Sequence, residues 1–183
     1  TNVTTGTTAG VGNSYPTYWG NGRQQYLIKA TELTALGFAA GNINSIGFNV
    51  AGTTGNPATL NGYTIKIAAT AATVLTTAFQ IPTFTTVFGP VNYTPVLNSL
   101  NTHTFSTPFA WNGSSNILID ICFSNQVVGV TAYQTFQTTS TFVSTTYYEA
   151  DGVAGAGACT QVTGTGTGSV RPNMKFSIGS STS

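Results

Sequence analysis

Charged side chains are scarce in this sequence. Its 183 residues include five Lys or Arg and four Asp or Glu, which is 5% of the chain, and the formal net charge at pH 7 is +1. The chain therefore has no basic patch that could bind nucleic-acid phosphates and no acidic tail that could attract a basic partner. Thr, Ser, Asn, Gln and Gly must supply the polar surface, a composition typical of an extracellular β protein. We expect no nucleic-acid partner.

Long apolar runs are also missing. No stretch of about 18 apolar residues could form a membrane-spanning helix, and we expect no membrane insertion. The start of the chain, TNVTTGTTAG, lacks the basic and apolar regions of a signal peptide, so we expect either a cytosolic protein or a mature secreted form. Hydrophobic residues nevertheless make up 40% and aromatic residues 11% of the chain. This is too much for a disordered protein and enough for the core of one domain.

Groups for acid-base or nucleophilic catalysis are few. His103 is the only histidine, and its place between Thr102 and Thr104 is typical of a surface or cross-strand histidine. Asp120 and Glu149 could pair across strands, but so could any two polar residues of a β-sandwich. The sequence has no Gly-Xaa-Ser-Xaa-Gly or His-Glu-Xaa-Xaa-His motif. We expect no enzymatic activity and no cofactor.

Short β-rich segments separated by Gly, Pro, Asn and Thr make up most of the chain. In one of them Ile65 and Ile67 alternate with Thr64 and Lys66, the period of a strand with one wet face. Strands are predicted in residues 23–30, 43–52, 62–70, 85–95, 101–111, 115–124, 127–136, 141–150 and 172–179. Residues 30–38, with leucines three apart and a glycine stop, predict a short helical turn. The sequence thus predicts an all-β, antiparallel β-sandwich that is jelly-roll-like, with about nine strands.

The two cysteines differ in their surroundings. Cys122 lies in the apolar run NILIDICFSN, whereas Cys159 ends a polar, glycine-rich loop in which a free thiol would be exposed. We therefore expect a disulfide between Cys122 and Cys159, which implies an oxidising compartment.

Asp120 interrupts the same apolar run, which is apolar enough to be buried on both faces of a strand. An unpaired carboxylate is costly there, so Asp120 needs a wet edge or a partner. Because the arginine fork can hold a carboxylate with two hydrogen bonds, we expect a structural ion pair with Arg171 of RPNMKF. A functional site around Asp120 is the alternative.

Several segments together resemble a known module. RQQYLIKATELTALGF, INSIGFNV, YTIKIA, NTHTFSTPFAWNGSSNILIDICFSN, TTYYEADG and RPNMKF, in this order from about Tyr15 to Phe176, are similar to a β-sandwich module of secreted proteins of Bacteroidetes. In that family the module occurs in large cell-surface or exported proteins, beside fibronectin-like repeats and a type IX secretion sorting domain. The resemblance implies an extracellular or cell-surface location and an adhesive, glycan-binding or accessory role. It assigns no catalytic residue.

Two of the four carboxylates, Glu149 and Asp151, lie in TTYYEADGVAGAGACT. The best interpretation is a stapled loop, in which Asp151 and Gly152 make the turn and the disulfide ties the end of the loop to a strand. Calcium binding is the alternative, because Glu149, Asp151 and the carbonyls of GVAGAG could supply several oxygen ligands. The Asp-Xaa-Asp-Xaa-Asp-Gly pattern of a hand-type calcium loop is missing.

Aromatic residues near loops predict a binding surface. Tyr15, Tyr18 and Trp19 cluster in SYPTYWGNGR, and Trp111 stands beside NGSS. Flat exposed rings can stack on sugar faces, which makes the chain a candidate carbohydrate-binding module with glycan partners. The alternative is that these rings cap the end of the sandwich core.

An assembly signal is found at the start of the chain, where fair β propensity is combined with uncharged side chains at Thr1, Asn2, Val3, Thr4 and Thr5. The polar segment of residues 1–14 could add as a strand to the edge of a neighbouring copy, and such a contact can repeat into a filament. The alternative is that this segment and the tail, residues 180–183, pack back on the domain formed by residues 15–179. We predict a non-enzymatic, extracellular structural or adhesive subunit that assembles with copies of itself into surface filaments. A carbohydrate-binding module is the alternative.

Overall fold

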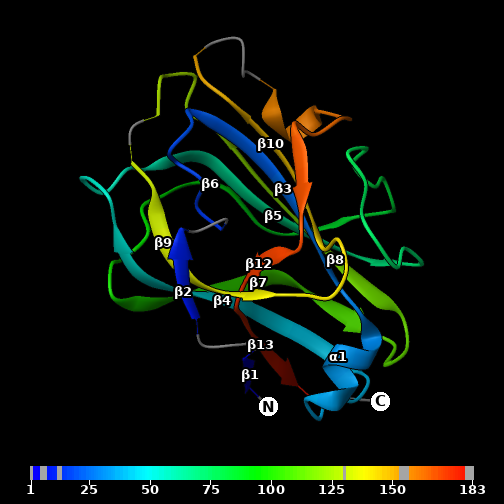
Figure 1. Cartoon of the computed structure of the whole chain (residues 1–183). Helices are drawn as coiled ribbons and strands as arrows, with labels where there is room; N and C mark the ends of the chain where they lie inside the picture. The colour runs from blue at the N-terminus through cyan, green and yellow to red at the C-terminus, as the bar shows by residue number, and fades with distance from the viewer. Residues whose placement is uncertain (1, 5–7, 12–13, 130, 153–156, 180–183) are drawn as a thin grey trace.

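Two antiparallel β-sheets face each other in the computed structural model, which describes residues 2–4, 8–11, 14–129, 131–152 and 157–179 (Figure 1). The seven-stranded sheet contains β1 (Asn2–Thr4), β2 (Thr8–Val11), β4 (Gly41–Thr53), β7 (Ser99–Trp111), β9 (Tyr133–Thr139), β12 (Val170–Pro172) and β13 (Met174–Gly179). The six-stranded sheet contains β11 (Gly166–Gly168), β10 (Thr145–Ala150), β3 (Asn21–Ile28), β8 (Asn116–Ser124), β5 (Leu60–Thr70) and β6 (Thr85–Tyr93), in this order. The predicted all-β antiparallel sandwich is confirmed.

The chain passes from one sheet to the other at most of its connections. β3 lies in the six-stranded sheet, β4 in the seven-stranded sheet, and β5 and β6 again in the six-stranded sheet, where they pair with each other. From β6 to β10 every connection crosses between the sheets. This repeated crossing is the jelly-roll-like feature that the sequence predicts, and it places segments far apart in the sequence side by side.

Each predicted strand has a counterpart, although some bounds differ. The largest shift is at β9, which is predicted at residues 127–136 and runs from Tyr133 to Thr139. β11 lies in a glycine-threonine segment without a strand signal and adds to the edge of the six-stranded sheet beside β10. Such a segment forms a strand because a neighbouring strand supplies its hydrogen-bond partners.

Helical structure is short. Helix α1 (Ala30–Ala35) lies inside the predicted range and is followed by Gly37, whose φ of 86° ends it. At its start the Glu32 side chain accepts a hydrogen bond from the Lys29 backbone N–H at 2.8 Å. The 3-10 turn η2 (Ala158–Thr160) was not predicted. Among the described residues no helix is long and apolar enough to span a membrane.

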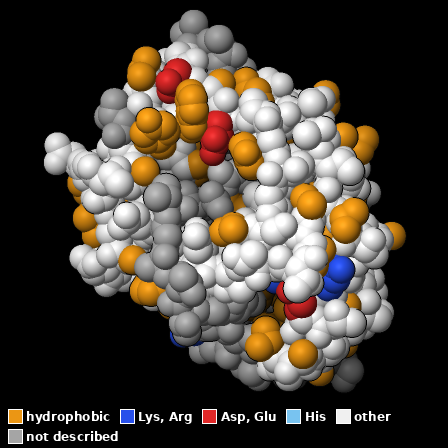
Figure 2. Space-filling view, viewed as in Figure 1, with side chains coloured by type: hydrophobic (Ala, Val, Ile, Leu, Met, Phe, Trp, Pro, Cys, Tyr) orange, Lys and Arg blue, Asp and Glu red, His pale blue; other side chains and the backbone are white. Residues whose placement is uncertain are grey.

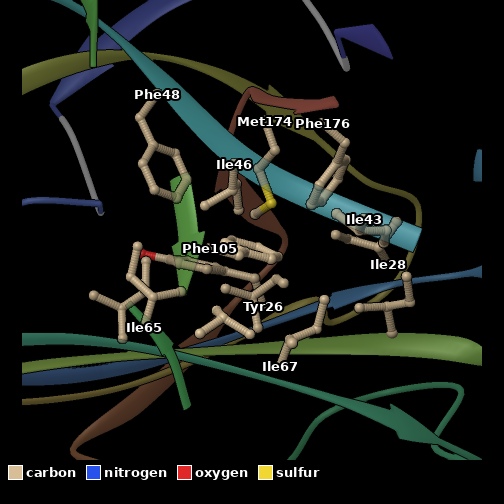
Figure 3. Packing of buried hydrophobic residues seen from close by; sticks show 14 of the residues in the cluster. Tyr26, Ile28, Ile43, Ile46, Phe48, Ile65, Ile67, Phe105, Met174 and Phe176 are labelled. Carbon is tan, nitrogen blue, oxygen red and sulfur yellow. The ribbon is translucent and has the colours of Figure 1, made fainter. Parts of the chain in front are cut away.

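The main core lies between the sheets. Figure 3 shows side chains of β4 and β13, among them Phe48 and Phe176, meeting those of β3 and β5, among them Tyr26 and Ile67. These side chains alternate along their strands with residues that point away from the core, as the period of a strand requires. Burying each large apolar side chain contributes about 1.5–3 kcal/mol. This cluster therefore supplies most of the hydrophobic stabilisation.

The outer face of the six-stranded sheet is also covered. All residues of β3 and all but the two end residues of β8 are buried. Leu27 and Leu118 form a second cluster on this face with Leu75 from the segment that follows β5. The burial of β8 on both faces, which the apolar run NILIDICFSN predicts, is thus observed.

Candidate functional site

Two aromatic side chains are exposed at one end of the sandwich. The turn that precedes β3 carries Tyr18, which is 59% exposed, and Trp19, which is 37% exposed. Their rings are 5.8 Å apart, edge to face, and we call this pair of rings the aromatic platform. Val127 and Val128, both exposed, belong to the segment packed against this turn. Figure 2 shows hydrophobic side chains beside acidic ones on the face toward the viewer.

The other two aromatic residues predicted to stack on sugars lie in the core. Tyr15 is fully buried, and its hydroxyl is 2.8 Å from Nε2 of His103. Trp111 is 2% exposed, and its indole N–H donates to the Ser115 carbonyl oxygen at 2.8 Å. The prediction was wrong for Tyr15 and Trp111, because their rings pack between the sheets while their polar atoms find partners inside. For these two residues the core-capping alternative holds.

Glu149 lies beside the platform at the end of β10. Its side chain is half-buried and accepts hydrogen bonds from Gln24, with Nε2 and Oε1 3.5 Å apart, and from the Trp19 side chain. Burial raises the pKa of the Glu149 carboxyl, and the hydrogen bonds from Gln24 and Trp19 act in the opposite direction. A carboxylate in contact with Trp19 thus lies next to an exposed ring.

Asp151 holds two loops together. Its Oδ1 accepts the backbone N–H of Gly20 and the backbone N–H of Gly129, each at 2.9 Å. Gly152 has φ of 64° and donates its N–H to the Val127 carbonyl oxygen at 2.9 Å. This arrangement is the turn that the stapled-loop interpretation predicts at Asp151 and Gly152.

The calcium alternative receives no support from the described residues. Among them no group of three or more His, Cys, Asp or Glu could hold a metal ion. The Asp151 oxygen that contacts Gly20 and Gly129 accepts N–H donors, and the carbonyls of residues 153–156 lie outside the part of the chain that the structure describes. Calcium binding by Glu149 and Asp151 stays a prediction.

The disulfide is present between Cys122 of β8 and Cys159 of η2, with Cα atoms 5.2 Å apart. It fastens η2 to the outer face of the six-stranded sheet, where Ala158 is fully buried. The predicted pairing is confirmed, and a disulfide of this kind fits an oxidising compartment.

The predicted ion pair between Asp120 and Arg171 was wrong, because Asp120 pairs with Arg23. Oδ2 of Asp120 is 2.6 Å from Nη2 and 3.0 Å from Nε of Arg23, and it also accepts from Gln25 at 2.7 Å. β3 and β8 are antiparallel neighbours, which puts Arg23 and Asp120 diagonally opposite on the outer face of the sheet. Phe79 from a covering segment lies 4.5 Å from the Arg23 guanidinium.

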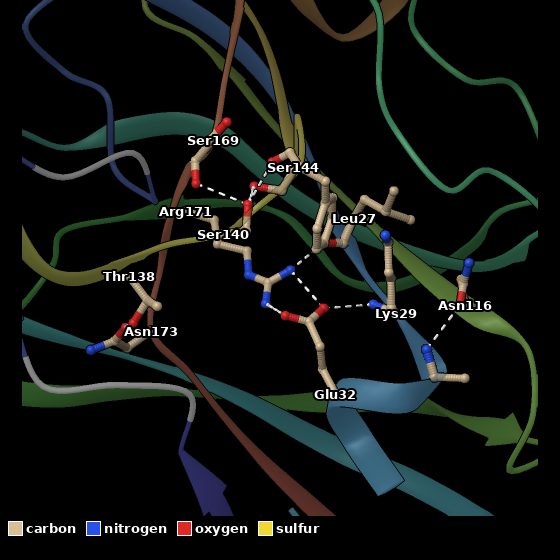
Figure 4. Close-up of polar contacts among 12 residues, drawn as sticks. Leu27, Lys29, Glu32, Asn116, Thr138, Ser140, Ser144, Ser169, Arg171 and Asn173 are labelled. Carbon is tan, nitrogen blue, oxygen red and sulfur yellow. Dashed lines mark hydrogen bonds and ion pairs between the residues drawn. The ribbon is translucent and has the colours of Figure 1, made fainter. Parts of the chain in front are cut away.

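Arg171 instead pairs with Glu32 of α1 (Figure 4). Its Nη1 lies 3.1 Å from Oε2 of Glu32, and it also donates to the Leu27 carbonyl oxygen. The same Glu32 oxygen accepts the Lys29 N–H, so the pair connects the end of β3, α1 and β12. Each arginine pair thus joins segments that are far apart in the sequence.

His103 lies opposite Ile46 of the neighbouring strand β4, which is the expected cross-strand position, but its side chain lies in the core and not at the surface. Its ring is fully buried in contact with aromatic rings, with the Phe88 and Tyr93 centroids 4.6 and 4.7 Å away. Burial lowers the pKa of His103 to about 3, so the ring is neutral at physiological pH.

The N-terminal segment adds to its own domain. Asn2, Val3 and Thr4 pair with Ser177, Phe176 and Lys175 of β13, and Thr8–Val11 pair with β9. Thr1, Thr5 and the C-terminal tail, residues 180–183, lie outside the described residues. This pairing is the alternative in which the N-terminal segment packs back on the domain.

Comparison of the chain with protein-family models, with curated proteins and with solved structures found no match. The function therefore has to be inferred from the residues themselves. The features that bear on it are the exposed Tyr18 and Trp19, the adjacent Glu149, and the loops that Asp151 joins.

Proposed function

We propose that this protein is a non-enzymatic, extracellular adhesive module that binds carbohydrate through the aromatic platform. The observation that carries the proposal is the pair of exposed rings, Tyr18 and Trp19, on a turn that is tied into the sandwich. Neighbouring exposed apolar side chains mark binding sites more often than scattered single ones do, and Val127 and Val128 are exposed beside the two rings. Rings of this kind also offer contact area at a low cost in side-chain entropy.

Sugar rings fit such a surface chemically. The axial C–H groups of a pyranose present an apolar face that can lie on Trp19 or Tyr18, while its hydroxyl groups need hydrogen-bond partners at the side. The Glu149 carboxylate, next to Trp19, is an acceptor for these hydroxyl groups. The edge-to-face arrangement of the two rings presents two differently inclined faces, which suits a bent saccharide chain better than a flat one.

The setting supports an extracellular role. The disulfide between Cys122 and Cys159 indicates folding under oxidising conditions, and the near-absence of charge removes the nucleic-acid partners typical of many intracellular modules. The resemblance to secreted modules of Bacteroidetes agrees with an adhesive role at the cell surface.

A glycan array followed by titration calorimetry tests the proposal. We expect a saccharide ligand whose affinity falls at least about tenfold in Trp19→Ala and Tyr18→Ala, as for central aromatic contacts in binding sites. Ile81→Ala is the matched control, because Ile81 is 81% exposed on a different segment, and it should bind as the natural protein does. Binding that survives the loss of both rings would contradict the proposal.

Self-assembly is the second candidate function. It is favoured by the place of β1 at the edge of the seven-stranded sheet, where Asn2–Thr4 pair only with β13 among the described strands. A three-residue edge strand that is held by one neighbour can leave its own domain and pair in the same register with a second copy, which repeats the contact from subunit to subunit.

Deletion of residues 1–10 tests assembly separately. The shortened chain should remain folded and monomeric, while electron microscopy of the full-length protein at high concentration should show filaments that the deletion abolishes. A full-length protein that stays monomeric at high concentration rules this second candidate out and leaves the carbohydrate proposal unaffected.

A further inference from the structure

We infer that Asp151 is the positioning residue of the aromatic platform, and that it sets the place of Tyr18 and Trp19 without contacting the ligand. The inference rests on the proposed function for its effect on affinity. Its structural part, the fixing of the platform turn, stands on the contacts of three segments that are far apart in the sequence: residues 15–20, 125–129 and 150–152.

The first two segments touch backbone to backbone. A Cβ atom on Gly20 would lie 1.6 Å from the Val127 carbonyl oxygen, and one on Gly129 would lie 2.4 Å from the carbonyl carbon of Trp19. Only glycine fits at Gly20 and Gly129, because any other side chain would force the segments apart. The platform turn is therefore pressed directly against the neighbouring segment, with no side chain between them.

The third segment locks this contact. Oδ1 of Asp151 lies between the segments and accepts one N–H from each glycine of the contact, Gly20 and Gly129, at 2.9 Å. Asn125 donates its N–H to the Gly20 carbonyl oxygen at 2.8 Å, which adds a direct bond between the first two segments. One carboxylate oxygen thus binds the backbone of both segments.

Trp19 lies immediately before one of these anchored amides. Loss of the Asp151 acceptor would leave the N–H groups of Gly20 and Gly129 without their partner, and the turn that carries the rings would be held to its neighbour less firmly. A ligand that stacks on Trp19 and Tyr18 would then have to order the turn as it binds, which lowers its affinity.

Asp151→Ala and Asp151→Asn form a matched pair of variants. Both remove the charge, but the asparagine keeps an oxygen in the place of Oδ1 and the alanine does not. In Asp151→Ala we expect the amide hydrogens of Gly20 and Gly129 to exchange at least about tenfold faster, because each loses a bond to a charged acceptor. Asp151→Asn should restore most of the protection.

Tryptophan fluorescence gives a second readout. Trp19 is exposed and Trp111 is buried, so acrylamide quenches mainly Trp19. Measured well below the melting temperature of each variant, quenching should increase in Asp151→Ala and stay near the natural value in Asp151→Asn. Affinity for the saccharide found on the array should follow the same order.

Gly129→Ala disturbs the contact between residues 15–20 and 125–129 without changing Asp151. It is the variant to use if Asp151→Ala does not fold. We expect the same rise in quenching and the same loss of affinity. If Trp19 quenching and the exchange of the Gly20 amide do not change in these variants, the positioning role is overturned. It is also overturned if Asp151→Asn loosens the turn as much as Asp151→Ala, because charge and not the acceptor would then decide.

The two proposals can fail independently. If the natural protein binds no saccharide while Asp151→Ala loosens Trp19, the carbohydrate proposal fails and the positioning role of Asp151 remains. If a saccharide binds and all variants bind it equally well with an unchanged turn, the positioning role fails and the carbohydrate proposal remains.

Discussion

β7 and β8 follow each other in the chain, yet they have opposite burial patterns. In β7, Asn101, His103 and Phe105 are buried while Thr102 and Thr104 between them are exposed. In β8 the run from Ile117 to Phe123 is buried throughout. The outer face of β7 is open to solvent, whereas that of β8 lies under segments held by Leu75 and by the disulfide. A strand with one covered face needs apolar side chains only at every second position. A strand with two covered faces also needs hydrogen-bond or ion-pair partners for the polar side chains that it buries.

We expect the largest effect on the free energy of unfolding at Asp120, on the covered outer face of β8. Replacing Asp120 with Ala leaves the Arg23 guanidinium buried without its counter-charge, and breaking a buried pair in this way costs about 3–5 kcal/mol. Urea denaturation should therefore show a large fall in the free energy of unfolding. The double variant Arg23→Met/Asp120→Leu is the control and should recover much of the loss, since apolar side chains can replace a buried pair. A small effect of Asp120→Ala alone would contradict the structural role of this pair.

Removing the disulfide tests how firmly the covering segments are held on the outer face of β8. The variant Cys122→Ser/Cys159→Ser should unfold at lower urea concentration, with a loss of about 2–4 kcal/mol, because the unfolded chain is no longer constrained. Hydrogen exchange should rise in η2 and in the covering segments before it rises in β7. Two freely alkylated thiols in the natural protein would show that the cover is not fastened in this way.

The inner face of β7 contains the buried histidine His103. The pKa of His103 falls from 6.5 to about 3 on folding because of its burial, so the unfolded chain takes up a proton below pH 6.5 and the folded protein does not until about pH 3. Stability is then full above pH 6.5 and is lost as the pH falls, by about 2 kcal/mol at pH 5 if His103 is the only group that contributes. Thermal unfolding from pH 7 to pH 4 measures this slope. His103→Gln should make it flatter, and an unchanged slope would assign the pH dependence to other groups.

Substitutions on the open outer face of β7 should change the free energy of unfolding least. Thr102 is exposed on this face, and Thr102→Val should change the free energy of unfolding by no more than about 0.5 kcal/mol, as is usual for surface positions. The equivalent measurement on Thr64, which is buried on the outer face of β5, gives the matched comparison between an open and a covered face. Equal effects at Thr102 and Thr64 would show that the cover is loose in solution.

Much of the fold could be predicted because strand signals are local. Alternation along residues 62–70 and 101–111 and the apolar run around Ile119 each lie within a few consecutive residues, and each corresponds to a strand of the structure. The shift of β9 has a physical reason. Gln126 adopts a φ of 58°, which does not fit a strand, and the neighbouring residues up to Gly129 pack against the Trp19 turn.

The candidate site was predicted less completely. The sequence indicates that Tyr15, Tyr18, Trp19 and Trp111 are aromatic residues near turns, but their exposure depends on which of them the second sheet covers. Tyr15 lies only three residues from Tyr18, and yet it is fully buried beside His103 while Tyr18 is largely exposed. The role of Asp151 also could not be predicted, because Gly20 and Gly129 are far from it in the sequence.

The sequence by itself determined the all-β class, most of the strands, and the pairing of its two cysteines, because hydrophobic period and composition act over a few residues and two cysteines allow one pairing. The tertiary structure alone decided that Asp120 meets Arg23 and that Arg171 meets Glu32. Such pairs depend on which strands become neighbours and in which register, and these are set by the packing of the whole core. The same reason separates Trp19 from Trp111: one ring lies at the end of the sandwich and the other lies between its sheets.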